Sequence, residues 1–344
     1  MVHDHKVKGL ALFGTVALAV TGLALTATAA PIPKDTVVTT YADNNATDQT
    51  LPQVITLTKD SDPTGFAFVN PNPGSDRAWL APIGFGPDGH LYLAIASQNG
   101  TLLDVTDGGD RSASTPVAKG FFPVLPHKIG GMAFDAEGNV YLTIEQSEDE
   151  SGSGADPTLT LPITRVNLTT GAKSTLNGAF NHAKGLALRT DANKNEILYI
   201  AEEVTGKILT YNLTTDKLDA KPFATGFPSG TDHVMAAIAF DPRGHLLAGW
   251  RLDPTDVSTG AIFDITNGGD FSDVTRTPPI LMGFPFNTDQ NGMAFDSKNN
   301  MYVGGDNHFT FVSNFDASTG KFAEFTQYAN DNGGGDSESI AVAP

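Results

Sequence analysis

The chain has 344 residues, of which 40% are hydrophobic, and it contains 36 glycines and no cysteine. The apolar share is ample for a packed core, and the lack of cysteine excludes disulfides, thiol catalysis and cysteine-based zinc sites. The formal net charge is −18, from 39 acidic against 21 basic residues. Because so acidic a surface repels phosphate groups, we expect no nucleic-acid partner and no binding to anionic membranes.

The first thirty residues are typical of a secretory signal peptide. A basic start is followed by an uncharged run from Gly9 to Ala30, which ends in TATAAP. The small residues near the end of this run predict cleavage after Ala29. An uncleaved membrane anchor is the alternative, since the run is nearly long enough to cross a bilayer. We expect a signal peptide at 1–29, a single mature domain at 30–344, and a secreted or periplasmic protein.

A short apolar motif recurs along the rest of the chain. Its starting positions differ by 47 to 55 residues, which suits one four-stranded blade of a β-propeller per repeat. The six copies begin at Pro82, Gly131, Gly185, Ala237, Gly292 and Ser339, and they read PIGFGPDGHLYLA, GMAFDAEGNVYLT, GLALRTDANKNEILYIA, AIAFDPRGHLLAG, GMAFDSKNNMYVG and the truncated SIAVAP.

Each copy predicts two strands joined by a tight turn. The run GMAF alternates small and large apolar residues, Asp-x-x-Gly-Asn supplies the turn, and VYLT returns as the second strand. A second hairpin follows in most units, for example ITRVNLTTGAKSTL, and helical periodicity is almost absent. The chain is therefore expected to be all-β, with four-stranded antiparallel blades arranged radially around a central channel.

The last copy is too short to form a blade, because it begins at Ser339 and the sequence stops at Pro344. Candidate strands to complete it stand near the mature N-terminus, in TVVTTYA and QVITLTKD. Pairing the two ends in one blade would remove exposed sheet edges. We therefore predict a six-bladed propeller closed by its N- and C-terminal strands. Five or seven blades are the alternatives, because residues 60–81 fit the period poorly and their TGFAFV could begin another unit.

Two similar stretches, LLDVTDGGD from Leu102 and IFDITNGGD from Ile262, carry the aspartates and glycines of a calcium loop. Each lacks the distal glutamate of an EF-hand and falls at a predicted hairpin. We interpret both as turns, because Asp, Asn and Gly favour turn geometry without a metal.

Residues just before each inner strand are expected to converge at one mouth of the channel. The positions directly before the units hold three polar residues and three small ones. The polar residues, Lys184, Asn291 and Glu338, form the predicted inner ring. Neighbouring loop positions add a predicted rim of His127, His182, His233, Asp289 and Asp336.

Two interpretations of this mouth are open. It could be a polar pocket in which carboxylate and amide oxygens bind Ca²⁺ or another divalent metal, with histidines that bind a metal or transfer protons. Alternatively, Lys184 and Glu338 pair within a closed channel, and the histidines are ordinary loop residues.

The units GMAFDAEGNVYLT and GMAFDSKNNMYVG resemble those of the regucalcin/gluconolactonase-like and NHL-type propellers over essentially the whole mature chain. In the gluconolactonase-like family, Glu and Asn/Asp side chains just before inner-strand glycines hold a divalent metal that acts on lactones or phosphoesters. The resemblance implies Asn291 and Glu338 as metal ligands. Where that family has further oxygen ligands, this chain has Gly, Ala and the cation Lys184, which would repel a divalent metal.

The polar residues predicted at this mouth of the channel suggest two functions. The first is a secreted, monomeric β-propeller that binds a small molecule, glycan or protein partner there without catalysis. The alternative is a metal-dependent hydrolase of lactones or related esters, which would need Ca²⁺ or a similar cofactor. The first function uses Lys184, His127, Asp289 and Asp336 as ligand-binding residues, whereas the second uses Asn291 and Glu338 as metal ligands and His182 or His233 as the catalytic base.

Overall fold

The computed structural model describes thirteen segments of the chain. Apart from one turn of 3-10 helix, η2 (Val257–Thr259), the regular structure in these segments is all β. No helix among them is long and apolar enough to cross a membrane. The segments are residues 32–43, 53–57, 64–68, 80–95, 100–111, 113–121, 127–146, 158–229, 235–253, 256–284, 292–304, 309–330 and 335–344.

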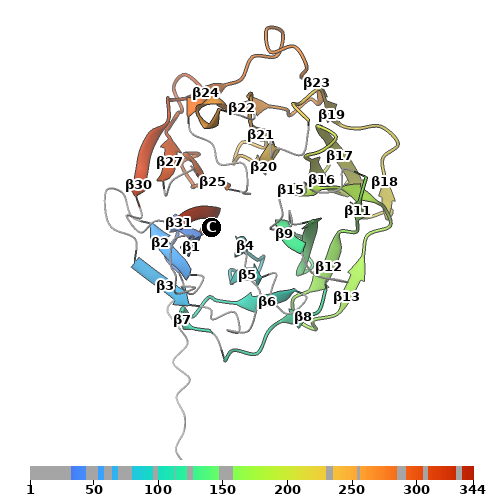
Figure 1. Cartoon of the computed structure of the whole chain (residues 1–344), viewed down its shortest axis with the longest axis vertical. Helices are drawn as coiled ribbons and strands as arrows, with labels where there is room; N and C mark the ends of the chain where they lie inside the picture. Colours follow the sequence, from blue (N-terminus) through green and yellow to red (C-terminus); the bar gives the residue numbers. More distant parts are fainter. Residues whose placement is uncertain are drawn as a thin grey trace, which may run out of the picture.

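The strands form a ring of sheets around a central axis (Figure 1). Five of these sheets are built from strands that follow one another along the chain with antiparallel pairing, and we call them blades 1 to 5. Blade 1 contains β4 (Leu80–Phe85), β5 (Leu91–Ile95), β6 (Thr101–Asp104) and β8 (Ala118–Lys119). Blade 2 contains β9 (His127–Phe134), β10 (Asn139–Gln146), β12 (Thr164–Asn167) and β13 (Lys173–Thr175).

The next three blades repeat the same order from the axis outwards. Blade 3 contains β15 (Ala183–Thr190), β16 (Glu196–Glu202), β17 (Lys207–Asn212) and β19 (Ala224–Thr225), with β18 (Lys217–Leu218) beside β17. Blade 4 contains β20 (Met235–Phe240), β21 (Leu246–Arg251), β22 (Gly260–Asp264) and β24 (Leu281–Phe284). Blade 5 contains β25 (Met293–Phe295), β26 (Met301–Gly304), β27 (Phe309–Ser313) and β30 (Thr326–Asn330).

A further sheet, the terminal sheet, joins the two ends of the described chain. Strand β31 (Gly335–Val342) pairs antiparallel with β1 (Val37–Asp43), which pairs in turn with β2 (Gln53–Leu57) and through it with β3 (Thr64–Phe68). The segment TGFAF is thus the fourth strand of this sheet and not the start of another unit, which corrects the alternative raised from its sequence. Two small two-stranded sheets stand apart: β11 (Thr160–Leu161) with β14 (Phe180–Asn181), and β28 (Phe315–Asp316) with β29 (Lys321–Phe322).

The Asp-x-x-Gly-Asn turns are held by the aspartate side chain. In blade 2 the Asp135 carboxylate accepts hydrogen bonds from the backbone and side-chain nitrogens of Asn139, both at 2.7 Å, and from the Tyr141 hydroxyl at 2.9 Å. Asp296 holds the turn of blade 5 in the same way. The carboxylate therefore fixes both the turn and the start of the returning strand, as the repeat predicted.

The two Asp-Gly stretches are turns, as predicted, and each also reaches the neighbouring sheet. In the first, the Asp104 carboxylate accepts from the backbone and hydroxyl of Thr106 and lies 2.6 Å from His90 Nδ1. The glycines that follow form β7 (Gly109–Asp110), which pairs parallel with β3. In the second stretch, β23 (Gly269–Asp270) pairs parallel with β19. Each stretch thus extends the outer edge of the preceding sheet.

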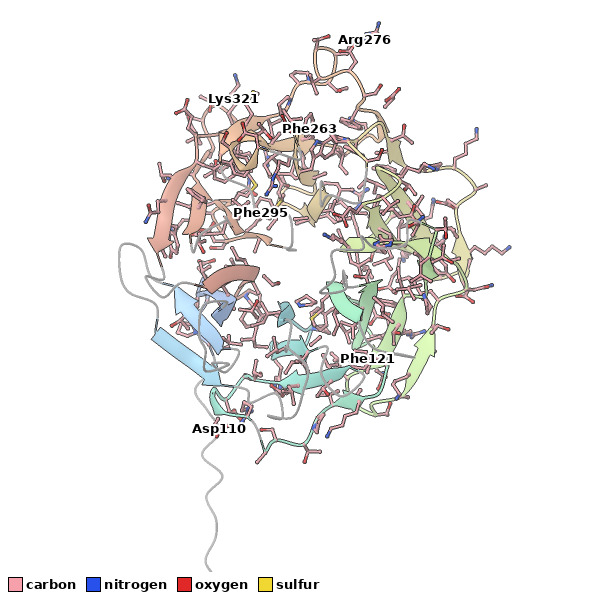
Figure 2. The ribbon with its side chains drawn as sticks, in the orientation of Figure 1. Asp110, Phe121, Phe263, Arg276, Phe295 and Lys321 are labelled. Atoms are coloured by element: carbon pink, nitrogen blue, oxygen red, sulfur yellow. The ribbon has the colours of Figure 1, made fainter. Side chains whose placement is uncertain are left out.

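The core is divided into clusters that lie between neighbouring sheets. One cluster joins Leu102 of blade 1 to Val140 of blade 2, and another joins Leu247 of blade 4 to Met301 of blade 5. Figure 2 shows the same distribution, with Phe263 inside the ring and the charged side chains of Arg276 and Lys321 at its outer rim. Each sheet thus buries both faces against its neighbours.

Candidate binding site in the axial channel

The innermost strand of each sheet borders the axis (Figure 1). Each of these strands is the last in its sheet, so only one of its two edges is paired within the sheet. The other edge of a strand in this position carries a row of backbone N–H and C=O groups, which are turned towards the channel. The six strands are β4, β9, β15, β20, β25 and β31.

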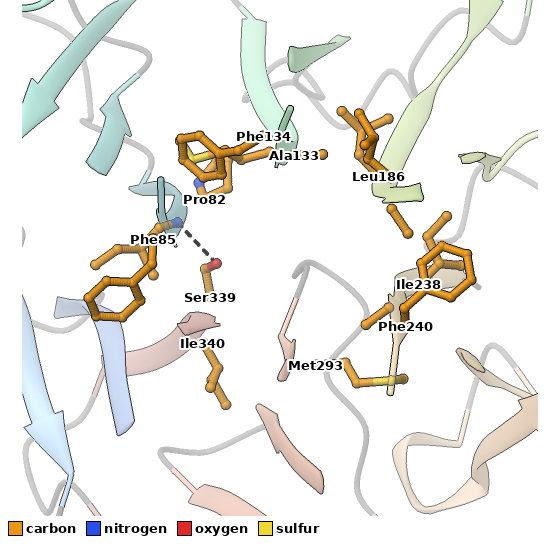
Figure 3. Close-up of a pocket in the computed structure, with 15 residues that line it drawn as sticks. Pro82, Phe85, Ala133, Phe134, Leu186, Ile238, Phe240, Met293, Ser339 and Ile340 are labelled. Carbon is orange, nitrogen blue, oxygen red and sulfur yellow. Dashed lines mark hydrogen bonds between the residues drawn. The ribbon is translucent and has the colours of Figure 1, made fainter. Parts of the chain in front are cut away.

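These six strands together surround a cavity of about 370 Å³. Figure 3 shows residues from these strands arranged in a ring around this space. Fourteen of the fifteen residues that line it have apolar side chains and Ser339 is the exception, while the unpaired backbone edges of the strands add polar N–H and C=O groups to the surface. The residues that represent each strand are Phe85, Phe134, Leu186, Ile238, Met293 and Ile340.

Ser339 supplies a hydroxyl group to this lining. It is only 3% exposed, and its Oγ accepts a hydrogen bond of 3.2 Å from the backbone nitrogen of Ile83 (Figure 3). The bond joins β31 of the terminal sheet to β4 of blade 1. Because a hydroxyl has one proton to donate as well as lone pairs to accept, this contact leaves its donor for another group.

A second hollow of about 410 Å³, whose lining includes Asp135 as well as apolar residues, lies where the inner strands end. Phe85 and Phe134 line both this hollow and the central cavity. The two spaces therefore share a wall of two aromatic rings, one from blade 1 and one from blade 2. The other end of the channel, where the inner strands begin, is the mouth at which the sequence predicted a polar site.

Of the predicted ring and rim, the structure describes the side chains of two residues, His182 and Lys184. Both are buried, at 4% and 2% exposure. His182 has a φ of 47°, in the left-handed region that few residues other than glycine adopt, and this conformation directs the chain into β15. The Lys184 ammonium group lies 3.1 Å from a carboxylate oxygen of Glu203.

Glu203 was not among the residues predicted at the mouth. Its side chain is 3% exposed, so the pair with Lys184 is almost completely removed from solvent. The backbone nitrogen of Glu203 donates to the carbonyl of His182, and Ala183 pairs with Glu202 in the hairpin register. This hairpin register is the sequence signal that could have identified Glu203, because it places the end of β16 beside the start of β15.

The neighbouring Glu202 completes a buried polar cluster. Its carboxylate accepts from the backbone nitrogen of Asn181 at 2.7 Å and from the Thr205 hydroxyl at 2.8 Å. A buried charge is tolerated only where partners compensate for lost hydration. With its ammonium engaged by Glu203, Lys184 is part of this internal network and does not resemble a metal ligand.

The remaining predicted site residues are not tested by the described structure. Strand β9 begins at residue 127, and residues 336 and 338 belong to β31, but their side chains are outside the description. Three others lie entirely outside the described segments. The untested residues are His127, His233, Asp289, Asn291, Asp336 and Glu338.

A group of carboxylates that the sequence did not reveal lies between blades 2 and 3, where their first hairpins turn. Oxygen atoms of Asp135, Glu137 and Glu196 lie within 4.8 Å of one another. Burial, followed by the negative charges of Glu137 and Asp135, raises the pKa of the Glu196 carboxyl group. Both Asp135 oxygens already hold the turn through Asn139 and Tyr141, so this group is explained by the fold of blade 2.

No protein-family model matches this sequence, and no curated protein is significantly similar to it. Solved structures do resemble it. TolB from Acinetobacter baumannii has a TM-score of 0.54 at 14% identity, with 91% of this chain and 68% of that chain covered. A structure of the nidogen/laminin complex has a TM-score of 0.53 at 11% identity, with coverage of 90% and 98%. At such identities the likeness shows the fold alone, and that fold is an all-β propeller arrangement.

Proposed function

We propose that this protein is an exported, monomeric β-propeller that binds a partner in its axial channel and has no catalytic activity of its own. The partner is a small molecule, or a group that projects from a glycan or a protein. The signal peptide at 1–29 directs the domain at 30–344 to the periplasm or the cell exterior. The observation that carries this proposal is the cavity of about 370 Å³ bounded by all six inner strands.

The terminal sheet is the sixth blade in this proposal. Its pairing of β1 with β31 joins the two ends of the chain. One apolar cluster packs Val38 of this sheet against Leu91 of blade 1, and another packs Ile340 against Tyr302 of blade 5. A sheet with apolar neighbours on both faces supports a closed ring of six blades.

The size and the lining of the cavity support binding. Small-molecule sites have volumes of roughly 300–1,000 Å³ and are mainly apolar, with few polar groups to set orientation. The cavity falls at the low end of this range.

The lactone hydrolase is the less favoured function. Its metal would lie on the axis beside the predicted ring of Lys184, Asn291 and Glu338. The ring residue whose side chain is described, Lys184, is a buried cation paired with Glu203. A second cation near this ammonium would be repelled. Nothing in the described residues favours the hydrolase over binding.

The proposal is tested by thermal melting of the mature protein with three panels of compounds: neutral apolar molecules, neutral oligosaccharides and short peptides. The control is Ala239→Phe, which introduces a ring at a position that lines the channel. At least one panel is expected to raise the melting temperature of the wild type and not that of the variant.

Two results would count against the proposal. If no panel stabilises the wild type, or if the compounds stabilise both proteins equally, the channel is not the binding site. A stoichiometric metal in the purified protein, together with a lower melting temperature in EDTA, would favour the hydrolase instead. Circular dichroism of Ala239→Phe checks that the variant is folded.

A further inference from the structure

We infer that the ligand of the channel is a small, neutral, mainly apolar molecule that carries one hydrogen-bond acceptor, and that the Ser339 hydroxyl donates to this acceptor. The inference rests on the proposed channel function and names its class of ligand. It follows from three properties of the cavity: its uncharged lining, the hydrogen bonding of the Ser339 hydroxyl, and the flexible methionine side chains in its wall.

The lining favours a neutral ligand. None of the fifteen residues around the cavity has a charged side chain, and fourteen of them are apolar. A charged group taken from water into this space would lose hydration without gaining an opposite charge, which is strongly unfavourable. A ligand with many hydroxyl groups would need a partner for each of them, and the side chains of this lining offer a single hydroxyl group, that of Ser339. An apolar molecule instead gains free energy from every part that leaves water.

Ser339 gives this lining a directional group. Its Oγ accepts from the Ile83 backbone nitrogen, and among the described residues no acceptor takes the Ser339 proton. Thr143 offers a matched case between blades 2 and 3: its hydroxyl accepts from the Gly131 nitrogen and donates to the Lys184 carbonyl at 3.0 Å. The threonine hydroxyl thus both accepts and donates within the protein, whereas the serine hydroxyl lines the cavity and no described residue accepts its proton.

The cavity wall can adapt to a flat or branched ligand. Met132 and Met293 contribute unbranched side chains from β9 and β25. Methionine has three rotatable bonds and a polarizable sulfur that makes favourable contacts with aromatic rings. Phe134 and Phe240 add ring surfaces on opposite parts of the wall (Figure 3). This combination suits an aromatic or compact aliphatic ketone, ester or ether.

The experiment uses two naphthalenes of nearly equal shape. In 2-acetylnaphthalene a carbonyl group provides the acceptor, whereas 2-ethylnaphthalene has a methylene group in its place. Isothermal titration calorimetry measures both with the wild type, with Ser339→Ala and with Ile340→Val. The last variant changes the neighbouring lining residue without removing a hydrogen-bonding group.

The wild type is expected to bind the ketone about three- to tenfold more tightly than the hydrocarbon, as one neutral hydrogen bond allows. Ser339→Ala should abolish this preference by weakening only the ketone. Ile340→Val should change both affinities by the same factor. Ser339→Thr, which keeps a hydroxyl group, should keep the preference, and melting of each variant shows whether the loss of the Ile83 contact has unfolded it.

The outcomes separate this inference from the proposed function. If neither naphthalene binds but another panel stabilises the wild type and not Ala239→Phe, the ligand class is wrong and the channel function stands. If no panel acts through the channel, both are wrong. Equal binding of the two naphthalenes, unchanged in Ser339→Ala, would overturn the assignment of Ser339 as donor. Binding that persists in Ala239→Phe would place the naphthalene site outside the channel and overturn the inference.

Discussion

At two places a side-chain hydroxyl group links neighbouring inner strands, but the two hydroxyl groups differ in the hydrogen bonds that they make. Between β9 and β15, the Thr143 hydroxyl connects the Gly131 nitrogen to the Lys184 carbonyl and is satisfied on both sides. Between β31 and β4, the Ser339 hydroxyl accepts from Ile83 and lines the cavity. The first contact is satisfied and lies beside the buried Lys184–Glu203 pair of blade 3, whereas the second lines the channel.

The difference indicates which part of the channel is structural and which part binds. The satisfied Thr143 hydroxyl fixes how blades 2 and 3 meet, beside the buried Lys184–Glu203 pair of blade 3, and among the described residues both groups are engaged within the protein. A hydroxyl whose proton no described residue accepts, in a lining whose other side chains are apolar, can set the orientation of a ligand. Mutations should therefore lower stability at the β9–β15 contact and lower affinity at the β31–β4 contact.

The largest expected effect comes from breaking the ion pair beside the β9–β15 contact. Glu203→Gln leaves the Lys184 ammonium group, at 2% exposure, without its counter-charge. We expect the free energy of unfolding to fall by about 3–5 kcal/mol, because an uncompensated buried charge is strongly destabilising. Equilibrium unfolding in urea measures the loss.

Two controls make that result specific. Lys221→Met removes an exposed lysine of the same blade and should change stability by less than about 0.5 kcal/mol. The double variant Lys184→Met/Glu203→Leu removes both charges and should recover most of the loss. Similar losses in the single and double variants would mean that the site depends on shape and not on charge.

The next effect concerns how closely β9 and β15 approach. A Cβ atom at Gly131 would clash with the backbone oxygen of Lys184, so Gly131→Ala forces the two strands apart. We expect a loss of about 2–3 kcal/mol, as is typical when extra volume enters a packed interior. Gly292→Ala is the matched change in blade 5, where the nearest atom would be the Gly304 nitrogen at 3.1 Å. If Gly292→Ala costs as much as Gly131→Ala, the close approach of β9 and β15 is not what requires the glycine.

The two hydroxyl groups can be compared directly by deletion. Thr143→Val leaves the Gly131 nitrogen and the Lys184 carbonyl without their partner, and should lower the free energy of unfolding by about 2 kcal/mol. Ser339→Ala removes one accepted bond and should lower it by about 1 kcal/mol. Urea unfolding at one pH measures both. A larger loss in Ser339→Ala than in Thr143→Val would show that the β31–β4 contact is structurally the more important one.

The architecture was readable from the sequence because each repeat carries its own local signals. The turn aspartates, such as Asp135, act within six residues of themselves, and the inner strands follow from the GMAF pattern. The pairing of the chain ends was predicted from two strand-like segments that had no other partner. These features depend on short-range rules, or on a requirement that sheet edges be paired.

The site was less readable because its contacts are long-range. Ser339 seemed to be a departure from the glycine of the repeat, and its partner Ile83 is 256 positions away in the sequence. The Lys184–Glu203 pair crosses a hairpin and needs the register of β15 and β16, which periodicity alone does not give. Lys184 was expected in the inner ring of the mouth, and its partner Glu203 could not be chosen from the sequence among many acidic residues.

The smallest expected effect lies at the far end of the same blade 2–blade 3 interface, where like charges meet. Burial and the charges of Glu137 and Asp135 raise the pKa of Glu196, so ionisation of this group costs more in the folded state than in the unfolded chain. The cost is absent below the ordinary value of 4.5 and complete above the raised folded value.

Glu196→Gln should therefore be more stable than the wild type at pH 7 by a few tenths of a kcal/mol, because the group is partly exposed and screened. The advantage should disappear as the pH falls below about 4.5. Urea midpoints at pH 7 and pH 4 measure the difference, with Glu324→Gln, an exposed glutamate beyond blade 2 and blade 3, as the matched control. If Glu196→Gln is stabilised by the same amount at both pH values, the shape of the Glu196 side chain and not its charge is unfavourable. The two ends of this interface would then not differ electrostatically.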